Sequence, residues 1–248
     1  DKTEELGPTE LVIFAVKTYD TQNALTALKP VVGPQTTILT LQNGVESYSI
    51  LQNTFGKRKV LPGTAYIESR ISSPGIVTQS GDVIRIILGE VTGKQSRRTT
   101  GIHGELLHAS INTEVSPNIL KALWTKFLFI SSLAGLTSAC RTSIGELIKK
   151  DIGYRRILIN AMNEVEQVGL AHGIEFDIDV VQQTMDYVDN AVADIKASMH
   201  IDLEKGRRLE LETFNGAVVR LGEKVGVDTP VNQFLYMILK PHIGGKYK

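Results

Sequence analysis

The sequence contains a single cysteine, and its positive and negative charges balance. One cysteine, Cys140, excludes an intrachain disulfide framework and a thiolate metal cluster, and it suits a reducing compartment. Lys and Arg total 27, as do Asp and Glu, so a formal net charge of zero gives no long-range field to attract nucleic acid or an anionic membrane. We therefore expect a cytoplasmic protein with neither of these partners. The basic clusters are short and scattered, typical of solvated faces and helix ends: 57–59, 97–98, 149–150 and 205–208.

Patterns of several other protein classes are also missing. The longest uncharged stretch of the most apolar region, residues 127–140, is shorter than the ~20 residues that a bilayer span needs, and the charged residues 1–5 do not resemble a secretion signal. The five histidines show no metal-binding spacing, so no metal site is predicted. Neither a Gly-x-Ser-x-Gly elbow nor a Gly-x-x-x-x-Gly-Lys-Ser/Thr loop occurs, which disfavours hydrolases and P-loop enzymes.

The first half of the chain has the alternating pattern of an α/β sheet. Apolar runs at 11–16, 36–41 and 60–61 predict buried parallel strands, separated by helices over about 21–28 and 47–55. Lys17 and Asn43 follow the first two strands, at the corners where open α/β sheets bind ligands. Runs at 64–69, 75–79 and 83–89 then predict antiparallel hairpins, with Pro74-Gly75 and Gly81-Asp82 as turns.

The second half has the pattern of a helical domain. After a helix over about 102–110, Ser116-Pro117-Asn118 precedes a long apolar-periodic stretch, so we place a boundary near 116 and expect domains over 1–116 and 117–248. The predicted helices cover about 118–139, 143–148, 151–173, 177–193, 203–225 and 230–239. The predicted fold class is thus α/β plus all-α: a truncated Rossmann-like parallel sheet domain and then a helical domain.

The sequence lacks the phosphate-binding motif with which dinucleotide-binding folds normally begin. Such folds open with a strand and a Gly-x-Gly-x-x-Gly turn whose helix holds the pyrophosphate, and nothing before Leu11 supplies them. We therefore expect an N-terminal portion of the domain to be missing from this sequence.

Lys126 is the first candidate for chemistry. Leu123, Trp124, Phe127 and Ile130 recur around it at helical spacing and define a buried stripe. A lysine held against apolar surface has a lowered pKa, which suits it to donate a proton near neutral pH. The alternative is that its stem lies along the helix while its amine stays in water.

The second candidate is a cluster of acidic residues near an Asn-Gly pair. In a helix, Glu210 and Glu212 would point about 200° apart, so one carboxylate can face a cleft while the other faces water, although exposure of both is the alternative. A glycine within a helix costs about 1 kcal/mol relative to alanine, so Asn215-Gly216 indicates close packing against another element.

Taken together, these segments resemble the ketopantoate reductase family, whose members reduce 2-dehydropantoate with NADPH. The resemblance spans nearly the whole chain, and it rests on the order and spacing of pieces that are each weak alone. The matching segments are Ala15-Val16-Lys17-Thr18-Tyr19-Asp20, Leu41-Gln42-Asn43-Gly44-Val45, Gly63-Thr64-Ala65-Tyr66-Ile67, Leu123-Trp124-Thr125-Lys126-Phe127, Gly145-Glu146-Leu147, Ser198-Met199 and Glu210-Leu211-Glu212-Thr213-Phe214-Asn215-Gly216.

The resemblance implies a role for each matching site residue. Lys126 would protonate the oxygen of the reduced ketone, and Ser198 would bind the substrate, a 2-oxo acid. Asn43 and Glu210 would each contact substrate and the NADP cofactor, while Lys17 and Ser69 would contact the cofactor, Ser69 at a position where the family usually has alanine. The helical halves of such enzymes often pair, so a homodimer is expected.

Four positions depart from the pattern of the family. Family members commonly place asparagines around the substrate where this chain has Ile130, Ala134, Ile144 and Ile195. Losing a buried amide partner costs about 1–3 kcal/mol, so these changes favour a different preferred substrate or weaker binding. Ser131 and Ser132 are candidates to compensate.

Three hypotheses follow. The first is NADPH-dependent reduction of 2-dehydropantoate to pantoate, and the second is a related reductase acting on a more apolar 2-oxo acid. The third is a non-catalytic binding or dimerisation module, because the phosphate-binding turn is lacking. The segment that selects NADP over NAD is also the one not found here, so NADP rests on the resemblance alone.

Overall fold

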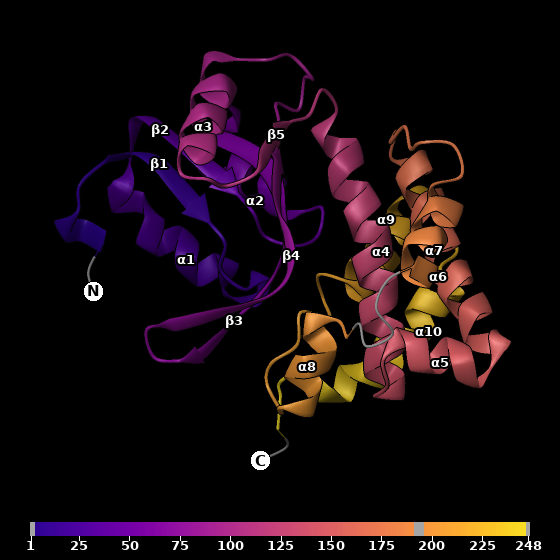
Figure 1. Ribbon diagram of the computed structural model, residues 1–248. Coiled ribbons are helices and arrows are strands. Elements are labelled where there is room, and N and C mark those ends of the chain that lie inside the picture. The colour runs from indigo at the N-terminus through magenta and orange to yellow at the C-terminus, as the bar shows by residue number, and fades with distance from the viewer. Residues whose placement is uncertain (1–2, 191–195, 247–248) are drawn as a thin grey trace. The chain divides into compact units, whose positions relative to one another are not determined.

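A computed structural model describes residues 3–190 and 196–246 of the chain. Its contacts divide into two compact units that meet between Leu123 and Trp124, within one long helix. Among the described residues, strands occur only in the first unit, and the second is helical (Figure 1). The sequence placed the boundary near 116, before this helix. That the first half binds NADP, and that the second binds substrate and forms the dimer, stay predictions.

The first unit is built on a five-stranded sheet with the order β1-β2-β3-β4-β5. Its neighbouring strands are parallel except for the pair β3 and β4. The strands are β1 (Thr9–Phe14), β2 (Val32–Thr40), β3 (Val60–Ser73), β4 (Ile76–Leu88) and β5 (Thr113–Val115), and the helices are α1 (Thr21–Leu28), α2 (Ser47–Phe55) and α3 (Arg97–His108). The mostly parallel sheet followed by a helical unit confirms the predicted fold class. That an N-terminal portion is missing stays a prediction.

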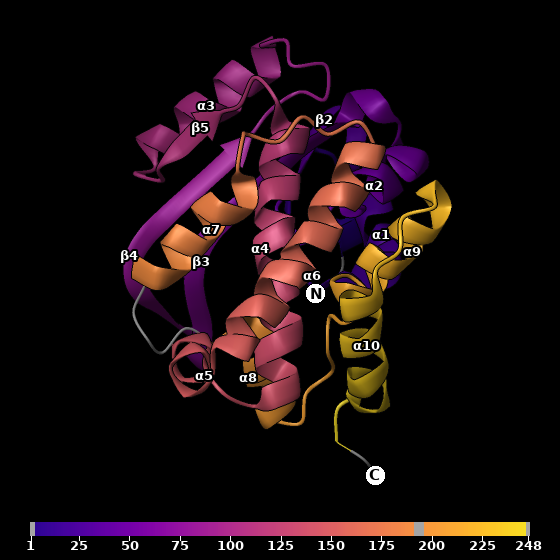
Figure 2. The same cartoon turned by 90° about the vertical axis from the view of Figure 1, so that its right-hand side faces the viewer.

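Helices cover both faces of this sheet, as the continuous apolar runs of its strands require. Successive β2 residues show the alternation: Ile38 packs in a cluster with Leu25 of α1 and Leu51 of α2, whereas Leu39 packs in another with Ile102 of α3. Figure 2 shows α1 and α2 on the side of the sheet opposite to α3. The central strands of the sheet are therefore buried between two helical layers.

One long hairpin replaces the predicted series of short ones. Strands β3 and β4 run without interruption on either side of a turn at Pro74-Gly75, where Gly75 has a φ of 78°. Gly81-Asp82 is not a turn, because β4 continues through it; the strand pairing shifts register there, between the pairs Ile67–Ile84 and Glu68–Ser80. A glycine inside a strand marks such a bulge as readily as it marks a turn.

In the described residues, the helical unit contains helices α5 to α10 and all but the first turns of α4. They are α4 (Ile119–Cys140), which begins in the first unit, α5 (Ile144–Lys150), α6 (Ile152–Ala171), α7 (Val180–Asn190), α8 (Ser198–Glu204), α9 (Asn215–Val225) and α10 (Pro230–Leu239). The sequence predicted most of these within a few residues. The helix predicted over 203–225 is wrong, because residues 205–214 form turns and extended backbone between α8 and α9.

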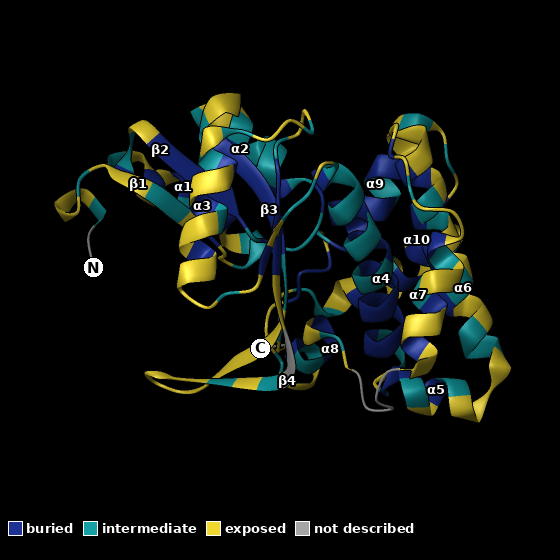
Figure 3. Ribbon diagram, turned by 45° about the horizontal axis from the view of Figure 1, so that its top comes forward, coloured by how far each residue is buried: buried dark blue, intermediate teal, exposed yellow. Residues whose placement is uncertain are grey.

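Helix α4 forms the core of the helical unit. By length and composition its 22 residues can span a membrane, but 61% of its most apolar window is buried inside the protein (Figure 3). Every residue from 131 to 138 is buried, so neighbouring elements contact the helix all round at this level. Its hydrophobicity therefore reflects a central position in the fold.

Helix α3 begins five residues before its predicted start. Ser96 forms a capping box with Thr99: the Ser96 hydroxyl accepts a hydrogen bond from the Thr99 amide, and the Thr99 hydroxyl accepts one from the Ser96 amide. The first turn contains two threonines and Gly101, which are poor helix formers, so sequence periodicity did not reveal it.

Candidate active site

Lys126 lies on α4 among large apolar side chains of the helical unit. Leu123, Trp124 and Phe127 are each at most 6% exposed, and the Trp124 and Phe127 rings pack edge to face with centroids 5.7 Å apart. Lys126 itself is partly buried. Burial lowers the pKa of its amine from 10.5 to about 8, against the opposing effect of the negative charge of Glu210. At neutral pH this amine is still mostly protonated, yet it gives up its proton more readily than an ordinary lysine.

The negative charge of the Glu210 carboxylate acts on the Lys126 amine and raises its pKa against the effect of burial. Glu210 lies between α8 and α9, is only 5% exposed, and precedes a turn in which its carbonyl accepts hydrogen bonds from the amides of Thr213 and Phe214. Glu212, in contrast, is exposed and binds Arg220 and Tyr236. Glu210 is buried and Glu212 is exposed, which is one of the two alternatives that the sequence left open, but the cause is the turn and not the predicted helix.

Helices α4 and α9 approach each other closely where Gly135 meets Asn215. Gly135 of α4 lies against the side chain of Asn215, the first residue of α9; a Cβ at Gly135 would lie 2.6 Å from the Asn215 Nδ2. Asn215 is fully buried and donates to the Asn232 Oδ1 at 2.9 Å. Asn232 in turn donates to Glu164, whose carboxylate accepts the first amides of α10. The predicted close packing at Asn215 is confirmed.

We expect Gly135→Ala to be destabilising by roughly 1–3 kcal/mol, because the added methyl group would overlap Asn215 and force α4 and α9 apart. Thermal unfolding would show this as a lower Tm, and the pKa of Lys126 would shift with it. A matched control is Gly104→Ala on α3, where a Cβ meets no atom within 4 Å. Equal Tm values for the two variants would contradict the role given to this contact.

In the first unit, Gln42 links the two strand ends that carry Lys17 and Asn43. Its Nε2 donates to the Val16 carbonyl at 2.8 Å and to the Thr21 hydroxyl at 2.9 Å. Lys17 follows Val16 directly, and Asn43 follows Gln42, so this side chain holds both corners at one edge of the sheet. Both residues are partly buried. Sequence reasoning missed Gln42 as a positioning residue, although it stands next to Asn43 in the matched segment.

The same edge carries polar atoms that suit a polar ligand. The Thr40 Oγ1 and the Gln42 Oε1 are buried and find no hydrogen-bond partner within residues 3–190 and 196–246. Buried polar groups normally have hydrogen-bond partners. Two oxygens without such partners at the carboxyl end of a parallel strand therefore fit a polar ligand bound there. The residues present thus fit part of a dinucleotide; the glycine-rich turn for its pyrophosphate does not occur in this sequence.

Comparison with known proteins identifies the family. A model of the ketopantoate reductase PanE/ApbA C-terminal region matches residues 118–242, and a model of ketopantoate reductase PanE/ApbA matches residues 1–93. The chain belongs to the ketopantoate reductase family. It is an NAD(P)-dependent oxidoreductase of that family.

Three relatives illustrate the similarity to this family. The 2-dehydropantoate 2-reductase of Aquifex aeolicus is 28% identical, with 93% of this chain and 76% of that protein covered. The crystal structure of 2-dehydropantoate 2-reductase from Geobacter metallireducens has a TM-score of 0.89 at 29% identity, covering 96% of this chain and 79% of that one. D-mandelate dehydrogenase, solved with NADH and anilino(oxo)acetate, has the same fold, with a TM-score of 0.86 at 22% identity and coverage of 95% and 76%.

Two further positions carried over from the ketopantoate reductase family are exposed. Ser69 lies on β3, opposite Gln79, in the part of the hairpin that extends past the β3 residues paired with β2. Ser198 is the first residue of α8. The structure leaves both side chains accessible to a ligand, and their roles stay predictions, as do those of Lys17, Asn43, Lys126 and Glu210.

Apolar side chains occupy the four positions where the family commonly has asparagines. Ile130 and Ala134 follow Lys126 by four and eight residues and so lie on its face of α4; Ile130 is partly buried and Ala134 is buried. Ile144, the first residue of α5, is 2% exposed. Ile195 lies outside the described residues.

The two serines expected to compensate lie elsewhere on α4. Five and six residues after Lys126, Ser131 and Ser132 point about 140° and 240° away around the helix. The Ser131 hydroxyl donates to the Phe127 carbonyl at 2.7 Å. Helix geometry therefore gives neither serine the place of the missing amides.

Two other predicted features can be compared with the structure. Cys140 follows an apolar helix, which predicts a buried and inert thiol. It is partly exposed, and partial burial raises the pKa of its thiol, which disfavours the reactive thiolate. Among the residues that the structure describes, no group of three or more His, Cys, Asp and Glu side chains is placed to hold a metal ion.

Proposed function

We propose that this member of the ketopantoate reductase family reduces a 2-oxo acid to the 2-hydroxy acid, with Lys126 as the proton donor. The observation that carries the proposal is the Lys126 amine, whose pKa is lowered to about 8 by burial in the same unit as the carboxylate of Glu210. A buried ionisable group with a perturbed pKa, such as Lys126, is typical of sites that transfer protons.

The residues of this chain stabilise the negative charge that develops on the ketone oxygen and protonate that oxygen. Reduction of the carbonyl carbon places negative charge on that oxygen, where a cationic donor is most effective. The Lys126 ammonium stabilises this charge and gives its proton to the oxygen, which yields the hydroxyl group. Glu210 keeps the amine protonated near neutral pH and binds a hydroxyl group of substrate or cofactor.

A reduced nicotinamide nucleotide, when bound, supplies the hydride. The residues that would hold it are Lys17, Asn43, Ser69 and Glu210. The unpaired oxygens of Thr40 and Gln42 suit a polar ligand at the strand ends that carry Lys17 and Asn43. We propose that this nucleotide is NADP, because the ketopantoate reductase family that the chain resembles uses NADPH. D-mandelate dehydrogenase was solved with NADH, so competition between the two nucleotides decides this point.

Ketopantoate is the first substrate candidate. Relatives at 28% and 29% identity carry the name 2-dehydropantoate 2-reductase, which supports this candidate. A more apolar 2-oxo acid is the second candidate, and a specific observation favours it. Ile130, Ala134 and Ile144 offer no side-chain hydrogen bond where the family commonly has asparagines. The ligand of D-mandelate dehydrogenase, anilino(oxo)acetate, carries an apolar phenyl ring.

A steady-state screen of 2-oxo acids with NADPH and NADH tests the function itself. We expect the full-length protein to oxidise reduced nucleotide with ketopantoate or with an apolar acid such as phenylglyoxylate. Absence of turnover with every 2-oxo acid, while nucleotide still binds, would favour the non-catalytic module. Sedimentation analysis of the same sample would test the predicted homodimer.

Ile130→Asn tests the substrate class. The new amide would lie on the Lys126 face of α4, so we expect the ratio of kcat/KM for ketopantoate to that for phenylglyoxylate to rise about tenfold, as one hydrogen bond of roughly 1–2 kcal/mol predicts. Ile157→Asn on α6, where the native side chain is 38% exposed, is the control. An unchanged ratio in Ile130→Asn would remove residue 130 from the substrate pocket.

A further inference from the structure

Asn215 joins the turn that contains Glu210 to the helix that carries Lys126. The Asn215 side chain is fully buried, and its Nδ2 donates to the Ser131 carbonyl of α4 at 3.3 Å. Ser131 follows Lys126 by five residues, and Asn215 follows Glu210 by five. A buried hydrogen bond therefore connects the two segments whose charges interact, those of the Lys126 ammonium and the Glu210 carboxylate.

Gly135 makes the Ser131 carbonyl accessible to Asn215. In an α-helix the carbonyl of one residue accepts from the amide four residues later, and the side chain of that later residue leans back over the carbonyl. Residue 135 stands four residues after Ser131 and is a glycine, and a Cβ there would lie 2.6 Å from the Asn215 Nδ2. The Asn215 amide thus fills the space that a side chain at position 135 would take.

Asn232 and Glu164 fix the orientation of the Asn215 amide. The Asn232 Nδ2 donates to the Ala161 carbonyl at 3.0 Å and to the Glu164 carboxylate at 2.7 Å, and both of these groups only accept hydrogen bonds. The Asn232 Oδ1 therefore faces Asn215 and accepts from its Nδ2 at 2.9 Å. The reverse orientation of the Asn215 amide would place its oxygen against two other oxygens, so the amide has one orientation.

Backbone hydrogen bonds hold the segment between Glu210 and Asn215. The Phe214 amide donates to the Glu210 carbonyl at 3.1 Å, and the Gly216 amide donates to the Leu211 carbonyl at 3.0 Å. The side chains of Leu211 and Phe214 are at most 2% exposed, so they anchor this segment in the core. A displacement of Asn215 would therefore move the Glu210 carboxylate with it.

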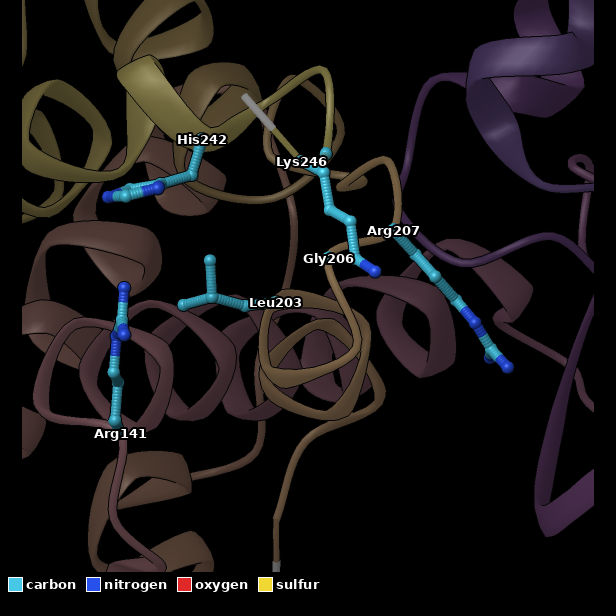
Figure 4. Close-up of a pocket in the computed structure, with 7 residues that line it drawn as sticks. Arg141, Leu203, Gly206, Arg207, His242 and Lys246 are labelled. Atoms are coloured by element: carbon cyan, nitrogen blue, oxygen red, sulfur yellow. The ribbon is translucent and has the colours of Figure 1, made fainter. Parts of the chain in front are cut away.

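One atom of the Asn215 side chain, its Oδ1, is buried and finds no hydrogen-bond partner among residues 3–190 and 196–246. Two cavities of about 170 Å³ near the carboxyl end of α4 share Arg141 and His242, which point toward each other in Figure 4, but neither lining contains Asn215. A ligand in these cavities would leave this oxygen unpaired. An apolar side chain of the same shape would avoid the cost of the oxygen, which favours a positioning role for the amide over packing alone.

We propose that Asn215 is a positioning residue that sets the distance between the Glu210 carboxylate and the Lys126 amine. Asn215 acts through the backbone of α4 and of the turn. Without its hydrogen bonds the two segments separate, and the attraction between carboxylate and ammonium weakens with distance, so the pKa of Lys126 falls. The inference rests on the proposed function of Lys126 as the proton donor.

Asn215→Leu tests this role, because leucine keeps the branched shape of the side chain and removes both hydrogen bonds. The pKa of Lys126 is measured by NMR of protein containing 15N-labelled lysine, which does not depend on turnover. We expect this pKa to fall below about 8, and the alkaline loss of kcat/KM to move to lower pH with it. Gly135→Ala displaces the same amide from the other side and is expected to lower the pKa in the same way.

A double-mutant cycle separates positioning from lost stability. In Glu210→Gln, which has no charge at position 210, adding Asn215→Leu is expected to leave the pKa of Lys126 unchanged. Met185→Ala is the matched control, because Met185 is fully buried on α7 and its loss lowers the Tm; it is expected to keep the native pKa of Lys126.

Two results would overturn the role of Asn215. One is a native pKa of Lys126 in both Asn215→Leu and Gly135→Ala. The other is a fall caused by Asn215→Leu that is equally large with and without the Glu210 charge, or equally large in Met185→Ala. A fall that depends on Glu210, together with native turnover in Lys126→Ala, would support the role of Asn215 and contradict the proposed function of Lys126.

Discussion

Replacing Lys126 with alanine is expected to lower kcat about 100-fold or more, which is the scale of losing a positioned general acid. KM is expected to change less than kcat, because the amine acts mainly on charge that develops in the transition state.

Lys126→Arg separates charge from proton transfer. A guanidinium group keeps the positive charge but does not release its proton near neutral pH, so this variant is also expected to be slow. Lys224→Ala, at an exposed position on α9, is the control and is expected to keep native turnover. Native-like turnover in Lys126→Ala would remove Lys126 from the mechanism.

Replacing Glu210 with alanine is expected to raise KM tenfold or more, since a charged hydrogen bond to a ligand is worth roughly 1.5–3 kcal/mol. Glu210→Gln keeps the shape of the side chain and removes its charge. The Glu210 carboxylate raises the pKa of Lys126, so without that charge the pKa falls further below about 8. The alkaline loss of kcat/KM, which follows deprotonation of the amine, is therefore expected to move to lower pH.

Glu212→Gln is a matched control two residues away. Its carboxylate is exposed and contacts Arg220 and Tyr236, so its replacement is expected to leave both KM and the pH profile unchanged. The same pH profile for Glu210→Gln and the native protein would show that the two charges do not interact. An unchanged KM in Glu210→Ala would place Glu210 outside the ligand site.

Sequence patterns predicted the features that depend on local periodicity. The apolar runs of β1 and β2 require helices on both faces, and the apolar stripe around Lys126 requires burial. Both patterns arise within a single element, where side-chain direction follows from residue spacing. For this reason the fold class and the lowered pKa of Lys126 could be predicted from the sequence.

Features that depend on contacts between distant residues could not be predicted in this way. Glu210 is buried because it lies in a turn between two helices, whereas the spacing argument assumed that Glu210 and Glu212 lie in one helix. Gln42 reaches a carbonyl 26 residues away, and Asn215 fills the space left by Gly135 on a helix 80 residues earlier. Gly81 lies at a bulge in β4, and the sequence alone does not distinguish a bulge from a turn, because the difference depends on the pairing with β3.

An NMR titration of protein containing 15N-labelled lysine tests the central claim most directly. The Lys126 side-chain signal is assigned by its absence in Lys126→Arg, and its chemical shift is followed from neutral to alkaline pH. The account predicts a pKa of about 8 for Lys126, lower still in Glu210→Gln. Titration of Lys126 near 10.5, the ordinary value for lysine, would contradict it.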